Sequence, residues 1–382
     1  TSGESAFKGF HTSKRNYDLA SFECKKCPNR CEIKRLRVKG ERPLLYGSRC
    51  ERFEVNRKKK KREQPLDLFA ERDRLLHQAF NENAVSSPNA PTIGIPRCLY
   101  FHELLPFFST FLSKLGYKVV LSDTTHKEII HSGVEHVVSE TCFPVKVAHG
   151  HILNLIEKGI KTIFFPSIIE MTRIHHDINR SQVCPYVQAL PYTLKSAFDF
   201  EKEGVEVISP VLHLGEGKKN VAKALGGIGK RLGKKTTAIN QALDTALQMQ
   251  NNFYTSMQKS GQTVLQQLTK DDIAMVVVSR PYNGCDAGIN LNLPRKITDL
   301  GIIALPMDYL PLEESGSVSE WKNMYWKYGQ RILAATHCIK SNPSLHALYL
   351  TNFGCGPDSF ISHFFKDNMK DTPYLTIEID EH

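Results

Sequence analysis

The stretch from Ala347 to Phe360, AlaLeuTyrLeuThrAsnPheGlyCysGlyProAspSerPhe, predicts a buried strand that ends near a cysteine and is followed by a helix. The apolar run ends at Thr351 and Asn352, glycines flank Cys355, and Pro357 suits a first helical turn. The Cys355 thiol would therefore lie between a strand end and a helix N-terminus. In open α/β sheets ligands bind at such strand ends, and free N–H groups there favour a thiolate or a sulfide-rich cluster.

Two other cysteines stand in a similar local sequence. Cys142 lies in SerGluThrCysPheProVal and Cys184 in SerGlnValCysProTyrVal, each with proline one or two positions later. A fourth candidate is Cys285, in ArgProTyrAsnGlyCysAspAlaGly at 280–288. Ligands from separate loops are common in iron–sulfur proteins, whereas zinc ribbons take close pairs. Three thiolates would leave one iron open to a substrate, and four would make an electron-transfer cluster.

Length and composition set broad limits. The chain has 382 residues, ten cysteines and a net charge of +10. That length predicts two α/β domains plus an appendage. No apolar run approaches the ~20 residues that cross a bilayer, and cysteines standing singly fit a reducing compartment, so we expect a soluble cytoplasmic protein. The first residue is Thr and the chain ends in IleGluIleAspGluHis, so we expect a piece of a longer polypeptide.

The N-terminal region carries its own metal-binding pattern. Cys24, Cys27, Cys31 and Cys50 have the spacing C-x2-C-x3-C-x18-C. Four thiolates in this arrangement hold either a structural zinc or a [4Fe–4S] cluster, and the spacing leaves both open. About 60 residues with few apolar side chains would need such a staple to fold.

A basic run, ArgLysLysLysLysArg at 57–62, follows this region. It would fit nucleic acid or a nuclear-import signal, but no aromatic residues interleave the charges as single-strand binding requires. We therefore interpret it as a solvated linker and do not expect nucleic-acid binding.

The rest of the chain alternates strand and helix patterns, which predicts parallel, doubly wound sheets. The fold class is therefore α/β, with two Rossmann-like or flavodoxin-like domains, a helical insertion and the small four-cysteine module. The expected divisions are the module with its basic linker at 1–65, a linker helix at 66–90, a first α/β domain at 91–215, a helical arm at 216–268 and a second α/β domain at 269–382.

The hydrophobic periodicity and the glycines at helix ends predict where individual strands and helices begin and end. In the first domain strands are expected at 92–96, 117–122, 134–139, 161–166 and 206–210, with helices at 99–115, 126–132 and 145–158. In the second, strands are expected at 272–279, 302–306, 347–352 and 374–379, with helices at 293–300, 320–335 and 359–368. The two domains would face each other across a cleft with cysteines on both sides.

For several other side chains we compare a functional role with a structural one. Arg280 could hold an anion or balance cluster charge, or form an ordinary ion pair. His149 and His151 could supply protons to a reduced substrate, or be structural helix histidines. Cys98 and Cys338 are interpreted as small buried hydrophobic residues. Motifs for hydrolysis, such as a nucleophile elbow or HExxH, are absent from the sequence.

Several segments together resemble the family of 2-hydroxyacyl-CoA dehydratases and their activators, which includes double-cubane-cluster proteins and fused activase-related proteins. They are IleGlyIleProArg (93–97), GluThrCysPheProValLysValAlaHisGlyHis (140–151), CysProTyrValGln (184–188), ArgProTyrAsn (280–283), ThrAsnPheGlyCysGlyProAspSerPhe (351–360) and IleAspGluHis (379–382). The CysLysLysCysProAsnArgCysGluIle segment also resembles the module that follows the ATPase domains in fused members.

The resemblance implies an iron–sulfur protein of anaerobes that receives an electron from an actin/sugar-kinase-type ATPase carrying its own [4Fe–4S] cluster. Cys142, Cys184 and Cys355 match cluster-ligating positions, and Cys285 is a further carry-over. The cofactor would be a [4Fe–4S] or an [8Fe–9S] double-cubane cluster, the substrate a small molecule such as an acyl-CoA, and the protein a homodimer. The alternative is a non-enzymatic zinc-ribbon scaffold or a nucleic-acid-binding protein.

Overall fold

The computed structural model describes residues 15–26, 29–49, 53, 66–313 and 320–381. The chain divides into two compact units, Thr1–Glu63 and Gln64–His382. Of the four N-terminal cysteines, Cys27 and Cys50 lie outside the described residues. The basic run at 57–62 lies outside them as well.

The first unit contains a small antiparallel sheet of order β1-β2-β3, with β1 at Tyr17–Glu23, β2 at Glu32–Val38 and β3 at Leu44–Tyr46. Cys24 follows β1 and Cys31 precedes β2, and the Cys24 N–H donates to the Cys31 carbonyl oxygen at 2.8 Å. Within its described part the buried residues are Cys24, Ile33 and Ser48. Hydrophobic burial therefore contributes little to the stability of this unit, as the sequence predicts.

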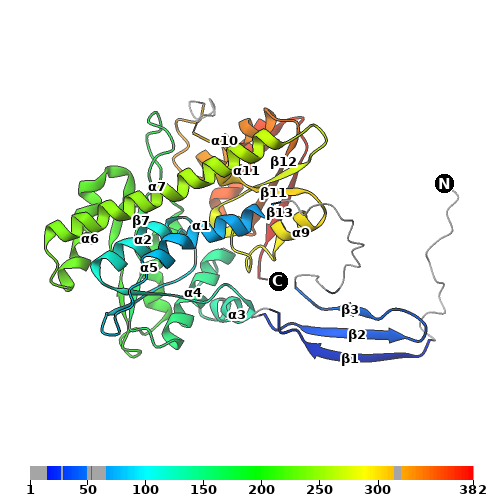
Figure 1. Ribbon diagram of the computed structural model, residues 1–382, viewed down its shortest axis with the longest axis horizontal. Coiled ribbons are helices and arrows are strands. Elements are labelled where there is room, and N and C mark those ends of the chain that lie inside the picture. The colour runs from blue at the N-terminus through cyan, green and yellow to red at the C-terminus, as the bar shows by residue number, and fades with distance from the viewer. Residues whose placement is uncertain (1–14, 27–28, 50–52, 54–65, 314–319, 382) are drawn as a thin grey trace. The chain divides into compact units, whose positions relative to one another are not determined.

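The second unit contains two four-stranded parallel sheets, which confirms the α/β class (Figure 1). One has the order β5-β4-β6-β8, with β4 at Thr92–Ile95, β5 at Lys118–Leu121, β6 at Thr162–Phe164 and β8 at Glu206–Ile208. The other has the order β11-β10-β12-β13, with β10 at Ala274–Val278, β11 at Ile303–Pro306, β12 at Leu345–Asn352 and β13 at Tyr374–Ile379. A parallel pair, β7 (Ser167–Glu170) and β9 (Val211–His213), completes the described strands.

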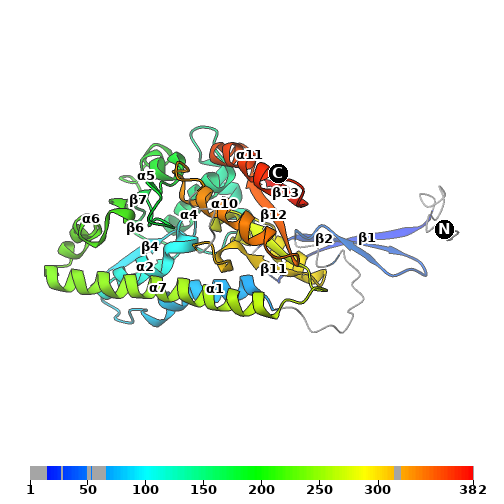
Figure 2. The same cartoon turned by 90° about the horizontal axis from the view of Figure 1, so that it is seen from above.

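Helices cover these sheets, and the longest, α7, runs alongside α1 and α2 in both views (Figures 1 and 2). Their bounds are α1 Leu68–Glu82, α2 Phe101–Leu115, α3 Lys127–Glu135, α4 Phe143–Glu157, α5 Pro185–Ala197, α6 Lys218–Arg231, α7 Thr236–Gln267, α8 Pro281–Gly284, α9 Leu293–Asp299, α10 Lys327–Lys340 and α11 Gly356–Met369, with 3-10 turns η2 at Leu214–Glu216 and η3 at Met307–Tyr309. Among the described helices none combines the length and the apolar character that crossing a membrane requires.

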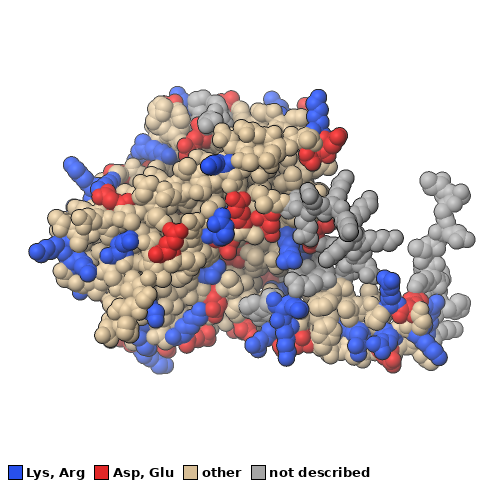
Figure 3. All heavy atoms as spheres, viewed as in Figure 1, with Lys and Arg blue, Asp and Glu red and all other residues tan. Residues whose placement is uncertain are grey.

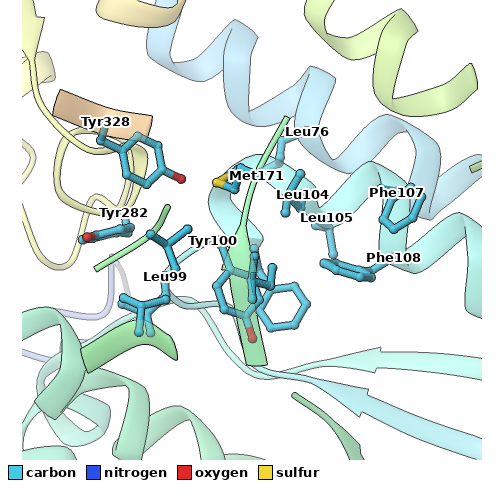
Figure 4. Close-up of a cluster of buried hydrophobic side chains, with 14 of the residues drawn as sticks. Leu76, Leu99, Tyr100, Leu104, Leu105, Phe107, Phe108, Met171, Tyr282 and Tyr328 are labelled. Carbon is cyan, nitrogen blue, oxygen red and sulfur yellow. The ribbon is translucent and has the colours of Figure 1, made fainter. Parts of the chain in front are cut away.

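A single large core joins the two sheets through the helices between them. Its aromatic part is a cluster around Tyr100, whose ring contacts those of Phe101, Phe108 and Phe165. Figure 4 shows Tyr100 and Phe108 within this core. These rings come from α2 and from the end of β6, and each is almost fully buried. Large aromatic side chains bury the most apolar surface per residue, so this cluster fixes α2 against the first sheet.

Two predicted elements are wrong. The strand expected at 134–139 is instead the end of α3 and the turn after it. The helix expected at 320–335 begins later, at Lys327, because residues 320–323 form turns and Trp326 is held in an extended bridge with Gln182. Valines at 134, 137 and 138 suggested a strand, but tertiary packing of α3 against α4 decides the structure.

Gly133 explains the first error. We expected Gly133 to end the helix predicted at 126–132, yet it lies inside α3. A Cβ atom at Gly133 would lie 2.3 Å from the Lys146 carbonyl oxygen, and one at Gly150 would lie 1.9 Å from that of Ile129. The two glycines therefore allow the backbones of α3 and α4 to cross in direct contact, and this crossing places the start of α4 at Cys142.

Gly150→Ala is expected to destabilise the protein by about 3 kcal/mol or more, because the added methyl group forces the two helices apart. Gly227→Ala is the matched control, since a Cβ atom there has nothing within 4 Å. In a helix interior that change should stabilise by up to about 1 kcal/mol. Urea unfolding of both variants measures the difference, and equal midpoints would show that the crossing is not tight.

Candidate functional site

Three cysteines immediately precede helices. Cys142 caps α4, Cys184 caps α5 and Cys355 caps α11, each with proline in the first turn and with extended backbone at the cysteine. Their carbonyl oxygens accept the first helical hydrogen bonds, for example from Gln188 N to Cys184 O at 3.0 Å and from Ser359 N to Cys355 O at 2.9 Å. Each thiol therefore sits where the helix dipole favours negative charge.

The structure brings these three cysteines around one side chain. Tyr282, in α8, is buried, and its electrostatic neighbours include Cys142, Cys184 and Cys355 together with Arg280. The tyrosine ring also packs edge-to-face on Tyr328, with ring centroids 6.0 Å apart (Figure 4). Cysteines that lie far apart in sequence thus share Tyr282 as a common neighbour.

Burial dominates the chemistry of these thiols. It raises the pKa of Cys142 to about 11, with the neighbouring Cys184 thiol adding to the effect. It likewise raises the pKa of Cys355 to about 12, against the influence of Arg280. At neutral pH both groups are therefore protonated in the absence of a bound cation. Metal binding requires thiolates, so uptake of a metal or a cluster here would release protons.

A buried ion pair lies beside the thiols. Arg280, between β10 and α8, pairs with Asp358 in the first turn of α11. Asp358 also accepts hydrogen bonds from Thr351 Oγ1 at 2.6 Å and from Tyr349 Oη at 3.1 Å. Both charged side chains are at most 4% exposed, so each buried charge lies against one of opposite sign. The pair joins the ends of β10 and β12.

This location is the switch point of the second sheet. The chain passes from β10 outward to β11 and later returns to β12 on the other side of β10. Crevices at the carboxyl ends of such strands are the usual ligand sites of open α/β sheets. Arg280 follows β10 and Cys355 follows β12, so two of the sequence-predicted residues lie at this edge of the sheet.

The distances between the three sulfur atoms show whether a single metal ion could bind all of them. In the described part of the chain the ligand atoms of Cys142, Cys184 and Cys355 are not all within 4.8 Å of one another. Thiolates on a single zinc ion, with Zn–S near 2.3 Å, would lie about 3.8 Å apart. In the described structure these three cysteines are therefore not arranged as ligands of a single zinc ion.

Asn283 is a buried polar residue near the cysteines whose side chain lacks a hydrogen-bond partner among the described residues. It is completely buried in α8, next to Tyr282, and neither its Oδ1 nor its Nδ2 has a hydrogen-bond partner among the described residues. Buried amides are normally satisfied, so such a group points to a missing partner. Within the ArgProTyrAsn segment, the three polar side chains are thus all buried at this edge of the sheet.

Cys285 is placed differently from the other three. Its electrostatic neighbours are Arg72, Asp308 and Arg331, and burial raises its pKa to about 12. Arg72 Nε donates to Asp308 Oδ2 at 2.8 Å, and Arg331 Nη2 donates to Asp308 Oδ1 at 2.7 Å. Cys285 thus lies beside a buried charge network, whereas the other three cysteines are neighbours of Tyr282. Cys98 is fully buried in the core and Cys338 is packed against it, as predicted.

The two histidines of α4 are held in local hydrogen bonds. His149 Nδ1 lies 2.8 Å from the Val145 carbonyl oxygen, and His151 Nδ1 and Nε2 lie 2.8 and 3.0 Å from the hydroxyls of Ser122 and Thr125. Burial lowers the pKa of His149 and lowers that of His151 to about 3. Within the described part of the chain, none of the hydrogen bonds or electrostatic neighbours given above for His149 and His151 involves Cys142, Cys184 or Cys355. Their geometry favours a structural role over proton donation.

His151 makes stability depend on pH. Its folded pKa lies near 3 and the ordinary value near 6.5, so the unfolded chain binds the extra proton between these values and stability falls as the pH drops below 6.5. From pH 7 to pH 5 this group alone should cost about 2 kcal/mol. His151→Gln should lose that part of the pH dependence. Urea unfolding at both pH values measures it, and His131→Gln, at an exposed histidine, should keep the wild-type loss.

A cavity that sequence reasoning missed lies near the buried charge network. Its volume is about 290 Å³. Glu103, Lys327 and Arg331 line it together with apolar residues of α2, α6 and α7. Lys327 Nζ donates to the Thr172 carbonyl oxygen at 2.6 Å, and burial lowers the pKa of this amine to about 8. These charges come from two distant helices, α2 and α10, so no local pattern reveals them.

These observations define a parallel-sheet α/β protein with three buried or partly buried cysteines at helix N-termini near one tyrosine. The chain belongs to the CoA enzyme activase uncharacterised domain family (DUF2229), whose family model matches residues 92–310. The match includes Cys142, Cys184 and Arg280 and ends before Cys355. Among curated proteins, no sequence matches this chain. The resemblance to activase-related and dehydratase-related proteins is thereby confirmed at the level of the family.

Proposed function

We propose that this protein is an iron–sulfur component of an acyl-CoA dehydratase-type system, with its cluster held by Cys142, Cys184 and Cys355. One observation carries the proposal: three separate helix N-termini place cysteines, one buried and two partly buried, near the same tyrosine. The chemistry of the donor set fits, because thiolates from separate loops are the usual ligands of such clusters. When bound, the cluster would supply one-electron transfer at low potential.

The protein's own residues would prepare the site for that chemistry. The helix N-termini and Arg280 favour negative charge on the thiolates and on the cluster they would hold. Tyr282, which is buried and lies near all three cysteines, would contribute an apolar ring to the surroundings of the cluster. Tuning by burial, hydrogen bonds and nearby charge is how proteins set the potential of such centres.

The proposed electron source is an ATP-hydrolysing activator of the actin/sugar-kinase type, either a separate protein or a fused domain. The name of the matched family, which refers to a CoA enzyme activase, supports a role beside such a system. The proposed electron acceptor is a small substrate of the acyl-CoA class. A second metal, zinc or a [4Fe–4S] cluster, is proposed for Cys24, Cys27, Cys31 and Cys50. We further propose a cytoplasmic homodimer.

The mixed surface supports this assignment over nucleic-acid binding. On the face shown in Figure 3, Lys and Arg side chains are interspersed with Asp and Glu over the second unit. Nucleic-acid binding instead favours a continuous basic patch. A small anionic substrate needs only a few cations at its site.

Anaerobic purification followed by iron and sulfide analysis tests the proposal. We expect a brown protein that contains both elements, and we expect a reductase-type ATPase with ATP to reduce it while the same ATPase without ATP does not. A colourless zinc protein that never takes up iron and sulfide would contradict the assignment. Steeply salt-dependent binding of DNA or RNA by that protein would favour the scaffold alternative.

A further inference from the structure

We propose a binding site for a divalent transition-metal ion, such as Mn²⁺ or Zn²⁺, formed by Glu170, His213 and Glu216. It is separate from the cysteines and does not depend on the proposed function. Each residue offers one ligand atom, and the three atoms lie within 4.8 Å of one another. Glu170 ends β7, His213 ends β9 and Glu216 ends η2, so the ends of three elements converge.

The strand pairing creates this convergence. β7 and β9 are parallel, and Glu170 is the register partner of His213 after an irregularity between Ile168 and Glu170. The chain then turns through η2 and returns Glu216 to the same end of the pair. His213 Nδ1 lies 3.5 Å from Glu216 Oε1, about the separation of two ligands on one metal ion.

Glu170 provides an independent sign of a missing cation. The residue is 3% exposed, and its Oε1 has no hydrogen-bond partner among the described residues. The nearest cation, Arg173 Nε, is 3.8 Å from that oxygen, too far for a hydrogen bond, and its side chain is half-exposed. A buried carboxylate oxygen without a partner is costly, so its retention indicates a ligand.

The surroundings fit a metal ligand set. Gly215 leaves room for the carboxylate, since a Cβ atom there would lie 3.3 Å from Glu170 Oε1. Asn220 Nδ2 donates to Glu216 Oε2 at 3.2 Å, which leaves Oε1 directed at His213. Hydrogen bonds of this outer kind orient ligating carboxylates. His213 and Glu216 are partly exposed, so water can complete the coordination.

The charges and ligand types select the metal class. Two carboxylates give a charge of −2, of which Arg173 offsets one. One imidazole with two carboxylates suits Mn²⁺, Fe²⁺ or Zn²⁺, whereas Mg²⁺ and Ca²⁺ prefer oxygen ligands alone. The ion would also stiffen a wall of the 290 Å³ cavity, because Met171 follows Glu170, Leu214 follows His213, and both line that cavity.

Mn²⁺ titration of the full chain tests the site, with free Mn²⁺ measured by EPR. Mn²⁺ avoids thiolate sites, so the cysteines do not interfere. Wild type should bind one Mn²⁺ ion. Glu170→Gln and His213→Ala should each weaken the Mn²⁺ affinity by at least about tenfold, since even loss of an outer-shell partner costs 10- to 100-fold. His175→Ala/His176→Ala is the control, because His175, His176 and Asp177 also group closely but are mostly exposed.

The proposal is overturned if the two site variants bind Mn²⁺ as wild type does, if wild type binds none, or if only the control loses binding. Glu216→Gln provides a second route should Glu170→Gln fail to fold, because Glu216 is half-exposed. Thermal unfolding gives an independent readout. Mn²⁺ should raise the midpoint of wild type and of the control, and leave that of each site variant unchanged.

Discussion

Arg280→Met is expected to lower the free energy of unfolding by about 3–5 kcal/mol, because it leaves the Asp358 carboxylate buried without its cation. Thr351 and Tyr349 would still donate to that carboxylate, but two neutral donors do not replace a charge. Methionine keeps most of the volume of the arginine, so the cost reports the lost charge and not a cavity.

The double variant Arg280→Met/Asp358→Asn should recover most of that loss, since it removes both charges and keeps the side-chain shapes. Urea unfolding of wild type, the two single variants and the double variant forms a complete cycle. We expect a coupling energy of at least about 1 kcal/mol, which is typical of groups in one network. Additive single effects would mean that the two groups are independent, contrary to the contact in the structure.

Cys142→Ser, Cys184→Ser and Cys355→Ser are each expected to abolish the low-potential cluster after anaerobic reconstitution. Serine keeps the size of cysteine and removes the soft ligand that iron–sulfur clusters require. Cys285→Ser should instead retain the cluster, because that thiol lies among Arg72, Asp308 and Arg331. Iron and sulfide content, with EPR of the reduced protein, measures all four.

The matched control for this series is Cys98→Ser, at a fully buried cysteine of the core. It should retain the cluster even if it lowers stability, so it separates ligand loss from loss of fold. Loss of the cluster in Cys285→Ser with retention in Cys355→Ser would overturn the assignment of the ligands. The N-terminal cysteines are intact in every variant, so any iron they hold is a constant background.

Local sequence predicts the elements around the site well. The apolar run before Cys355, the glycines beside it and the proline after it correctly give β12, the turn and α11. The same logic places Cys142 and Cys184 at helix N-termini, because proline in a first turn is a signal carried by neighbouring residues. The parallel sheets follow from the alternation of strands and helices.

Long-range packing accounts for what the sequence did not predict. Gly133 resembles a helix end, and only its contact with Lys146 of another helix shows that it serves a crossing. Cys285 stands in a segment like those of the other cysteines, yet its side chain lies beside Arg72, which is more than 200 residues earlier in the chain. The convergence of Glu170 with His213 likewise depends on β7 pairing with β9, which no local pattern reveals.

An iron anomalous-difference map from crystals of anaerobically reconstituted protein tests the central claim most directly. The account predicts iron density bonded to the Sγ atoms of Cys142, Cys184 and Cys355, beside Tyr282 and Arg280. Well-ordered cysteines with no iron between them, or iron confined to the N-terminal cysteines, would contradict it.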